Sequence, residues 1–200
     1  MRTLLSITVI LFSNFLFSQK KIFDENDKMI TLDEFNHRKN KLEGLKIAYN
    51  DSLDIAKITS DTEKGEIDSE KLITDLAHLL KLKISPTQPT IIVFYPGKDP
   101  CNSSGLSTPK SSFLDFKENE KKANKIKQSN LLYLYKSKEG IKTINKIKWY
   151  KDPKNIIENT FFHYHYPCSS YVILYNNKYI SHFGEFPLSS ILNNLKAIIQ

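Results

Sequence analysis

The sequence TIIVFYPGKDPCNSS, residues 90–104, decides the fold class of this chain. Its first six residues are all β-branched or aromatic, a composition typical of a strand buried in the middle of a sheet. Pro86 and Pro89 end the segment before it, and Cys101 follows it after a short polar loop. We therefore expect a central strand that brings a cysteine to one edge of a sheet.

Helices and strands are expected to alternate on both sides of this strand. Before it, Asp68 can cap a helix over residues 70–82, whose apolar side chains recur with the period of one helix face. After Cys101 the pattern predicts, in order, a helix to residue 127, a strand at 131–135, a helix at 153–163, strands at 171–175 and 179–183, and a helix at 188–199. A crossover helix makes the first two strands parallel, whereas the Asn176-Asn177 turn makes the last two antiparallel. The expected fold class is α/β, a four-stranded mixed sheet flanked by helices.

The chain before this domain predicts an irregular α+β extension at residues 19–66. The pattern indicates a hairpin at residues 21–30 and a second hairpin formed by residues 45–49 and 53–58. Thr31 and Glu34 have the spacing of a capping box before a short helix. The expected organisation is thus a leader at 1–18, the extension, and a main domain at 67–200.

The first 18 residues have the three-part plan of a secretory signal peptide. Arg2 precedes a mostly apolar stretch at residues 4–17, and Ser18 offers a small residue for cleavage before Gln19. The stretch is shorter than the roughly 20 residues of a spanning helix, so an uncleaved anchor is the less favoured interpretation. We expect a secreted or periplasmic protein that is not an integral membrane protein after cleavage.

Cys101 and Cys168 are the two cysteines among the 200 residues. Two thiols cannot build a disulfide framework or a four-thiolate zinc site. Outside the cytosol they can pair stably. The residues alone leave three interpretations open: a redox-cycling pair, a fixed structural bridge, or two separate thiols.

The charge of the chain is positive and concentrated. The formal net charge is +7, and residues 110–154 hold 13 lysines and 5 acidic residues. This segment contains no arginine and no base-stacking motif, so a solvated lysine face is expected rather than a nucleic-acid site. The sequence also lacks G-x-S-x-G, H-E-x-x-H and a phosphate-binding glycine loop, which excludes the enzyme classes that depend on them.

Residues 88–200 resemble the thioredoxin family in four features. Cys101-Asn102-Ser103-Ser104 follows a buried strand, as in the monothiol C-x-x-S variant of the family. Pro109 stands where the family has the proline that kinks its active-site helix. Tyr166-Pro167 precedes a strand at the place of the family's cis-proline, and Gly184-Glu185 ends the last strand before the C-terminal helix. The resemblance implies a thioredoxin-like fold.

The resemblance also implies thiol–disulfide exchange, with Cys101 as the nucleophile. Ser104 stands in place of the second cysteine of the family, which leaves Cys168 as the candidate resolving cysteine. A cis Pro167 would shape the substrate-facing loop and place it against the Cys101 turn. A helix N-terminus, Lys98 and Ser104 are expected to favour the thiolate of Cys101, whereas Asp99 opposes it.

Two other functions stay open at this point. One is a binding or structural module in which the two cysteines form an inert bridge. The other is a copper or zinc module that uses His163, His165 and Cys168. For the leading interpretation, a possible thiol-disulfide oxidoreductase, the expected partners are protein thiols or disulfides, or another protein partner, and no cofactor is needed.

Overall fold

The computed structural model describes residues 20–41, 45–50, 55–103, 109–141 and 147–200. The expected signal peptide, its cleavage point and Ser104 lie outside these ranges. None of the helices within them combines the length and the apolar character needed to span a bilayer.

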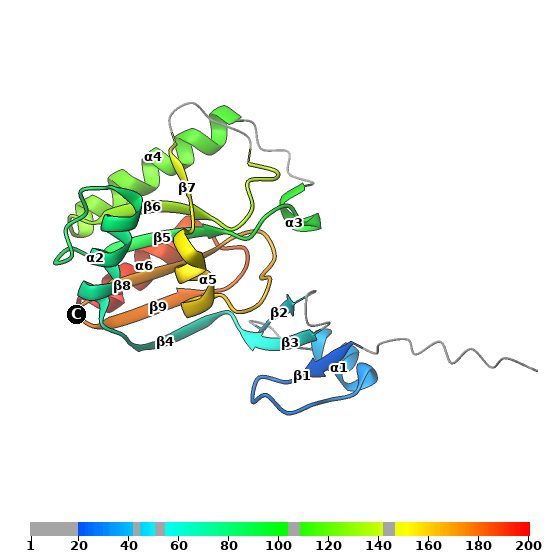
Figure 1. Ribbon diagram of the computed structural model, residues 1–200. Helices are drawn as coiled ribbons and strands as arrows, with labels where there is room; N and C mark the ends of the chain where they lie inside the picture. Colours follow the sequence, from blue (N-terminus) through cyan, green and yellow to red (C-terminus); the bar gives the residue numbers. More distant parts are fainter. Residues whose placement is uncertain (1–19, 42–44, 51–54, 104–108, 142–146) are drawn as a thin grey trace, which may run out of the picture.

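The main sheet has six strands in the spatial order β4-β9-β8-β5-β6-β7 (Figure 1). Their bounds are Thr62–Glu66 for β4, Thr90–Tyr95 for β5, Asn130–Tyr135 for β6, Trp149–Lys151 for β7, Ser170–Tyr175 for β8 and Lys178–His182 for β9. Strand β5 pairs parallel with β6 and antiparallel with β8, and β8 pairs antiparallel with β9. The expected mixed sheet and the directions of its four central strands are confirmed.

The count of four strands is wrong because each edge of the sheet carries one strand more. Strand β4 pairs antiparallel with β9, and β7 pairs parallel with the last three residues of β6. The β4 sequence Thr-Glu-Lys-Gly-Glu has no apolar face, which an exposed edge strand does not need. A Cβ atom on Gly65 would lie 2.6 Å from Cε1 of Tyr179 on β9, so the glycine leaves room for the end of this ring across the edge of the sheet.

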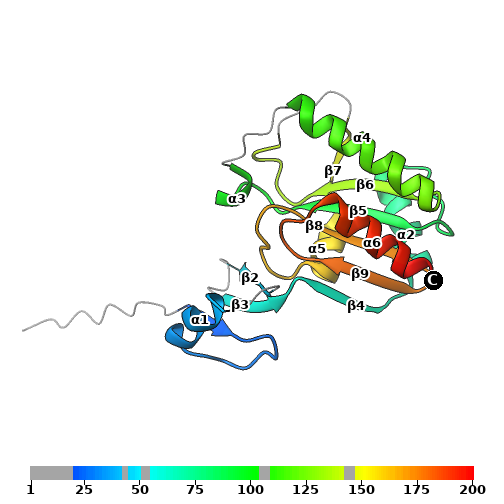
Figure 2. The same cartoon turned by 180° about the vertical axis from the view of Figure 1, so that it is seen from behind.

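Helices cover both faces of the sheet. Helices α2 (Ser69–Leu80) and α5 (Ile156–Phe161) lie over the face seen in Figure 1, and α4 (Pro109–Ile126) and α6 (Leu188–Ile199) over the face seen in Figure 2. All six residues of β5 are buried, and they alternate between the two layers. Ile92 and Phe94 belong to the apolar cluster with α2 and α5, whereas Ile91 and Val93 belong to the cluster with α4 and α6.

Two helices differ from their predicted bounds. The helix expected at 153–163 is split into a 3-10 turn, Pro153–Asn155, and α5, because Lys154 and Asn155 both have a φ of 54°. The polar helix expected from Cys101 to residue 127 is described as the short α3 (Pro100–Ser103) and as α4, and residues 104–108 lie outside the described ranges. Pro109 is the first residue of α4, a position where its fixed φ favours helix initiation.

The N-terminal extension forms a second sheet of three strands, in the order β1-β3-β2. Its strands are β1 (Lys21–Phe23), β2 (Leu45–Asn50) and β3 (Ile55–Ser60), and the antiparallel pair of β2 and β3 is the second expected hairpin. The first expected hairpin closes through the bridge between Phe23 and Met29. Helix α1 (Leu32–Lys39) is capped by the Thr31 side chain, which accepts from the Glu34 N–H at 3.1 Å, as the capping-box spacing predicts.

The small sheet contacts the main domain through strand β2. Tyr49 on β2 forms an antiparallel bridge with His165, which precedes β8, and the Tyr49 N–H donates to the His165 carbonyl at 3.1 Å. Ala48 is fully buried in the apolar cluster under α2 and α5. The extension therefore supports the loop that carries the second cysteine.

Candidate functional site

The candidate site begins where β5 ends. Beyond Tyr95 the chain turns at Gly97, whose φ of +129° lies in the region that favours glycine. A Cβ atom at this position would lie 3.1 Å from the Cβ of Ser137. The turn leads directly into α3, and Cys101 is the second residue of that helix. The central strand thus brings a cysteine to the edge of the sheet, as expected.

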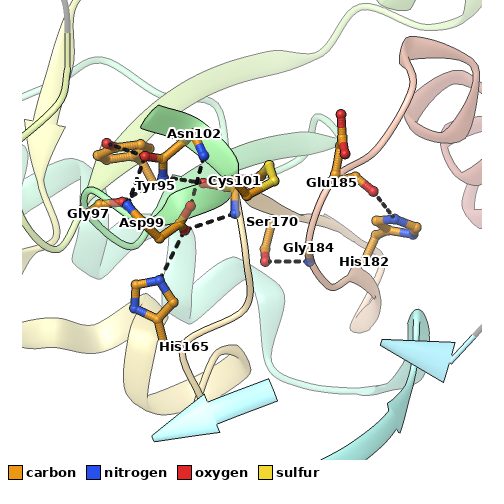
Figure 3. Close-up of a disulfide and its surroundings, with 11 residues drawn as sticks. Tyr95, Gly97, Asp99, Cys101, Asn102, His165, Ser170, His182, Gly184 and Glu185 are labelled. Atoms are coloured by element: carbon orange, nitrogen blue, oxygen red, sulfur yellow. Dashed lines mark hydrogen bonds and ion pairs between the residues drawn. A yellow bond between two sulfur atoms is a disulfide. The ribbon is translucent and has the colours of Figure 1, made fainter. Parts of the chain in front are cut away.

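Cys101 and Cys168 are joined by a disulfide bond (Figure 3). Their Cα atoms are 5.1 Å apart, inside the usual range for a disulfide, although 67 positions separate them in the sequence. Both residues are half-buried, so the bridge lies at the surface of the strand ends rather than in the core. Of the three interpretations of the cysteines, the one with two separate thiols is excluded.

The buried carboxylate of Asp99 links the two cysteine loops. Its side chain is 7% exposed. One oxygen accepts from the Asn102 N–H at 2.8 Å, and the other accepts from the Cys168 N–H at 3.0 Å. The second oxygen also lies 3.1 Å from Nε2 of His165. Asp99 therefore holds the Cys168 backbone from the Cys101 side of the bridge.

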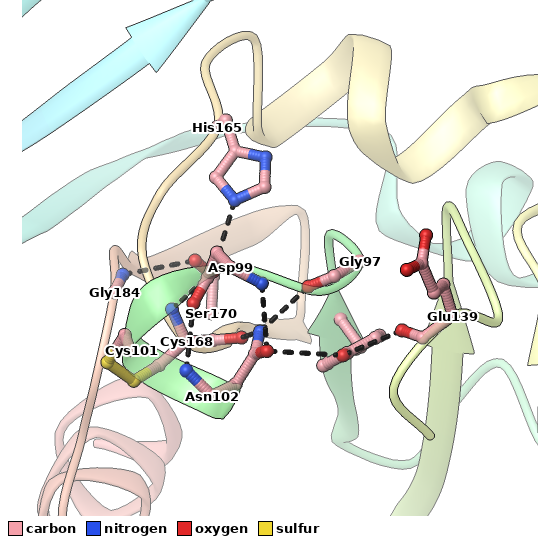
Figure 4. Close-up of polar contacts among 10 residues, drawn as sticks. Gly97, Asp99, Cys101, Asn102, Glu139, His165, Cys168, Ser170 and Gly184 are labelled. Carbon is pink, nitrogen blue, oxygen red and sulfur yellow. Dashed lines mark hydrogen bonds and ion pairs between the residues drawn. A yellow bond between two sulfur atoms is a disulfide. The ribbon is translucent and has the colours of Figure 1, made fainter. Parts of the chain in front are cut away.

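Asn102 makes a second link between the same loops (Figure 4). Its amide nitrogen donates to the Gly97 carbonyl at 2.7 Å and to the Cys168 carbonyl at 3.3 Å. Its amide oxygen accepts from the Asp99 N–H at 2.9 Å. Both backbone polar groups of Cys168 are thus bound by residues that flank Cys101. We call Asp99, Asn102 and the two cysteines the disulfide site.

The loop around Cys168 corrects one expectation. No peptide bond in the described residues is cis, so the Tyr166–Pro167 bond is trans. The left-handed backbone of Cys168, with a φ of 69°, makes the turn instead. Its N–H and carbonyl bonds to Asp99 and Asn102 hold this conformation, which explains why a cis-proline is not needed there. Pro167 still lies directly beside the bridge.

A third segment approaches the bridge from the end of β9. The Glu185 carboxylate lies within 4.8 Å of both sulfur atoms and is exposed. The Gly184 N–H donates to the Ser170 hydroxyl at 3.1 Å, and the Glu185 carbonyl lies 3.3 Å from Nε2 of His182 (Figure 3). Gly184 has a φ of +74°, and a Cβ atom on it would lie 3.4 Å from the Pro167 carbonyl oxygen. The backbone that carries Glu185 is therefore fixed against the Cys168 loop.

His182 is a buried support of this segment. Its ring stacks on Tyr171, with ring centroids 5.3 Å apart and planes 10° apart, and it is 6% exposed. Burial lowers the pKa of His182, partly offset by the Glu185 carbonyl and by Asp61. The neutral ring is therefore favoured, and a proton on Nε2 lets it donate to the Glu185 carbonyl.

Lys98 lies on the turn before Cys101. Its ammonium group is 3.9 Å from the Glu139 carboxylate, and both side chains are more than half exposed. Next to this pair, the Tyr95 hydroxyl donates to the Glu139 carbonyl at 2.9 Å. Burial raises the pKa of Tyr95, and the charges of Asp99 and Glu139 add to the shift, so this hydroxyl keeps its proton. The ion pair with Glu139 partly neutralises the charge of Lys98.

In the part of the chain that the structure describes, the two histidines of the expected metal site do not join the cysteines in one group of ligands. His165 faces Asp99, and His163 is exposed on the same loop. Across the described residues, three potential ligand atoms come together once, in Cys101, Cys168 and Glu185. The two sulfurs of that group are bonded to each other in this structure.

Sequence reasoning missed two contributions to the site. In the sequence Asp99 is only a charge that opposes the Cys101 thiolate, because nothing there shows that its carboxylate binds the Cys168 N–H. In the sequence Glu185 only marks the end of a strand, because its approach to the sulfurs depends on the turn at Gly184. Both arise from contacts between residues more than 15 positions apart, which a sequence pattern does not encode.

Comparison of the chain with protein-family models finds no match, and comparisons with curated proteins and with solved structures find none either.

Proposed function

We propose that this chain is an exported thiol–disulfide exchange protein with a thioredoxin-like fold. Cys101 and Cys168 form the exchanging pair, with Cys101 as the sulfur that bonds to substrate and Cys168 as the resolving cysteine. Pro167 shapes the adjoining loop, and Lys98 and Ser104 assist the thiolate of Cys101.

The carrying observation is that hydrogen bonds join the two cysteine loops in addition to the sulfur–sulfur bond. The Cys168 N–H binds Asp99 and the Cys168 carbonyl binds Asn102. When the bond opens, these contacts keep the two thiols adjacent. A preorganised dithiol at a half-buried surface position suits repeated opening and closing of the bridge.

The exchange reaction needs only the two cysteines and a substrate dithiol. A substrate thiolate attacks the sulfur of Cys101, the bridge breaks, and Cys168 leaves as a thiolate that takes a proton from water. The second substrate thiol, after losing its proton, attacks the substrate sulfur of the mixed disulfide and expels Cys101. The substrate is oxidised by two electrons, and the bridge becomes two thiols. Another disulfide running the same steps in reverse restores it.

Two features support the fold and the compartment. The four central strands and the C-terminal helix follow the order and directions that the thioredoxin resemblance implies. The leader-like residues 1–18 and a bonded lone cysteine pair agree with an oxidising compartment.

A redox titration of the purified protein tests the proposal. Equilibration with glutathione or dithiothreitol buffers, followed by thiol labelling, gives the reduction potential of the bridge. We expect a value above about −300 mV, the region of exchangeable disulfides. A lower potential would favour the rival function, a binding module with a structural bridge.

Trapping variants assign the roles of the two sulfurs. Cys168→Ser should accumulate mixed disulfides with a model disulfide substrate, because the Cys101 thiolate attacks it and expels one substrate sulfur as a thiolate, and no resolving thiol remains to release the other. Cys101→Ser should accumulate far fewer. Equal trapping by both variants would contradict the assigned roles, and none by either would contradict exchange chemistry.

A further inference from the structure

We propose that Glu185 gives the disulfide site a preference for substrate thiols that carry positive charge. The inference rests on the proposed function, because it concerns which thiols exchange with the Cys101–Cys168 bridge. The substrate class it names is a polypeptide cysteine flanked by lysine or arginine.

The first step is the position of the carboxylate. Glu185 is exposed, and its carboxylate lies within 4.8 Å of both sulfurs. A thiolate that attacks either sulfur must approach this negative charge. At such distances the Coulomb energy between the Glu185 carboxylate and a unit charge on the attacking thiol is large enough to change the rate of attack, even in water.

The second step is that the segment is held rather than free. Gly184 is bound to Ser170 through its N–H, and the Glu185 carbonyl faces the buried His182. Gly184 is also buried and closely packed against the Pro167 carbonyl. The fixed backbone therefore keeps the Glu185 carboxylate on one side of the bridge.

The third step concerns the other charges nearby. Lys98 is paired with Glu139, and Asp99 is buried against His165 and two backbone N–H groups. The lysines of residues 110–154 act over longer distances, and salt screens charges beyond about 8–10 Å. The side-chain carbons of Lys46 pass Gly184, where its charge contributes to the lowered pKa of His182. Glu185 is the acidic group that the described residues place within reach of both sulfurs.

The test uses three small thiols that differ in charge: cysteamine, 2-mercaptoethanol and 3-mercaptopropionate. Rates of bridge reduction are measured at low ionic strength and normalised to the thiolate concentration. The ratio of the cysteamine rate to the mercaptopropionate rate is then compared between wild type and Glu185→Gln. The intrinsic nucleophilicity of each thiol cancels in this double ratio.

We expect the ratio to fall about 5-fold in Glu185→Gln, and to fall in the wild type when salt is raised to 1 M. Glu66→Gln is the control, because it also removes one exposed carboxylate, at the end of β4 away from His182, and leaves both Glu185 and the Lys98–Glu139 pair in place. Its ratio should stay within twofold of wild type. The mutated side chains are exposed, so both variants should fold.

Two results would overturn the inference. One is an unchanged ratio in Glu185→Gln, and the other is an equal fall in both variants, which would indicate a general field rather than a local charge. Failure of all three thiols to reduce the bridge of the native wild type would instead contradict the proposed function.

Discussion

The disulfide site and the small sheet hold the same loop, residues 163–168, by different means. The small sheet binds it through backbone hydrogen bonds between Tyr49 and His165. The disulfide site binds it through a covalent bond and through the polar side chains of Asp99 and Asn102. The loop is therefore restrained from both sides, and only one of the restraints depends on redox state.

The two regions also differ in what stabilises them internally. The small sheet has its own apolar cluster, whose buried members are Ile22, Ile30, Phe35, Ala56 and Ile58. Apolar burial is non-directional and tolerates small shifts. The disulfide site depends on directional contacts to a buried carboxylate, where each lost partner leaves a polar group unsatisfied. A single substitution at the disulfide site should therefore lower the free energy of unfolding strongly, whereas one in the small sheet should lower it in proportion to the apolar surface that it removes.

Removal of the bridge should give the largest effect. In the Cys101→Ser, Cys168→Ser double variant, we expect the free energy of unfolding to fall by about 4 kcal/mol, because the bridge closes a loop across 67 positions of the unfolded chain. The Asp99 and Asn102 contacts should keep the fold intact. Urea unfolding measures the loss, and amide exchange at position 168 reports whether the loop stays ordered. An unprotected amide at this position would contradict loops that are held independently of the bond.

Loss of the buried carboxylate should be next in size. Asp99→Ala leaves the Cys168 and Asn102 N–H groups without their acceptor, and we expect a loss of about 3 kcal/mol in the free energy of unfolding. Glu139→Ala is the control, since its side chain is 72% exposed, and should change the value by less than about 0.5 kcal/mol. Similar losses in the two variants would show that the polar contacts of Asp99 add little.

The central part of the fold was predictable from sequence because its elements bury a regular apolar face. The four central residues of β5 are apolar and the whole strand is buried, and α2 repeats its apolar residues with helical period. The Asp68 cap is local in sequence, and the structure has it, with the Lys71 N–H donating at 3.0 Å. Such signals need no knowledge of distant residues.

The rest was not predictable because it depends on tertiary contacts. Strand β4 gains its strand form from pairing with β9, not from its own polar sequence. The trans Pro167 and the left-handed Cys168 depend on hydrogen bonds to a loop more than 60 positions away. At the candidate site, sequence named both cysteines and Pro167, whereas the supporting role of Asp99 and the approach of Glu185 follow only from the folded geometry.

Acidification should lower the free energy of unfolding through His182, which supports the segment beside the disulfide site. Burial lowers the pKa of His182 in the folded protein, so the unfolded chain binds the proton more readily. The free energy of unfolding should therefore be fully present above about pH 6.5 and fall as the pH drops below it, with a slope of at most about 1.4 kcal/mol per pH unit. Urea unfolding from pH 8 to 5 measures this. The slope should be shallower in His182→Gln, and an identical slope would show that other groups cause it.

The smallest effects should come from two helix caps, one in each region. Thr31→Ala removes the cap of α1 beside the small sheet, and Asp68→Ala removes the cap of α2 on the main sheet; each should cost about 1 kcal/mol locally.

Helix α2 buries Ile73 and Leu76 in the main core, so the Asp68→Ala loss should appear in global unfolding. Helix α1 contributes Phe35 to the small cluster alone, so Thr31→Ala should speed amide exchange in residues 20–60 and leave the global midpoint nearly unchanged. If Thr31→Ala lowered the global midpoint as much as Asp68→Ala, the two sheets would unfold as one unit, coupled through the loop at 163–168 and through Ala48 in the main core.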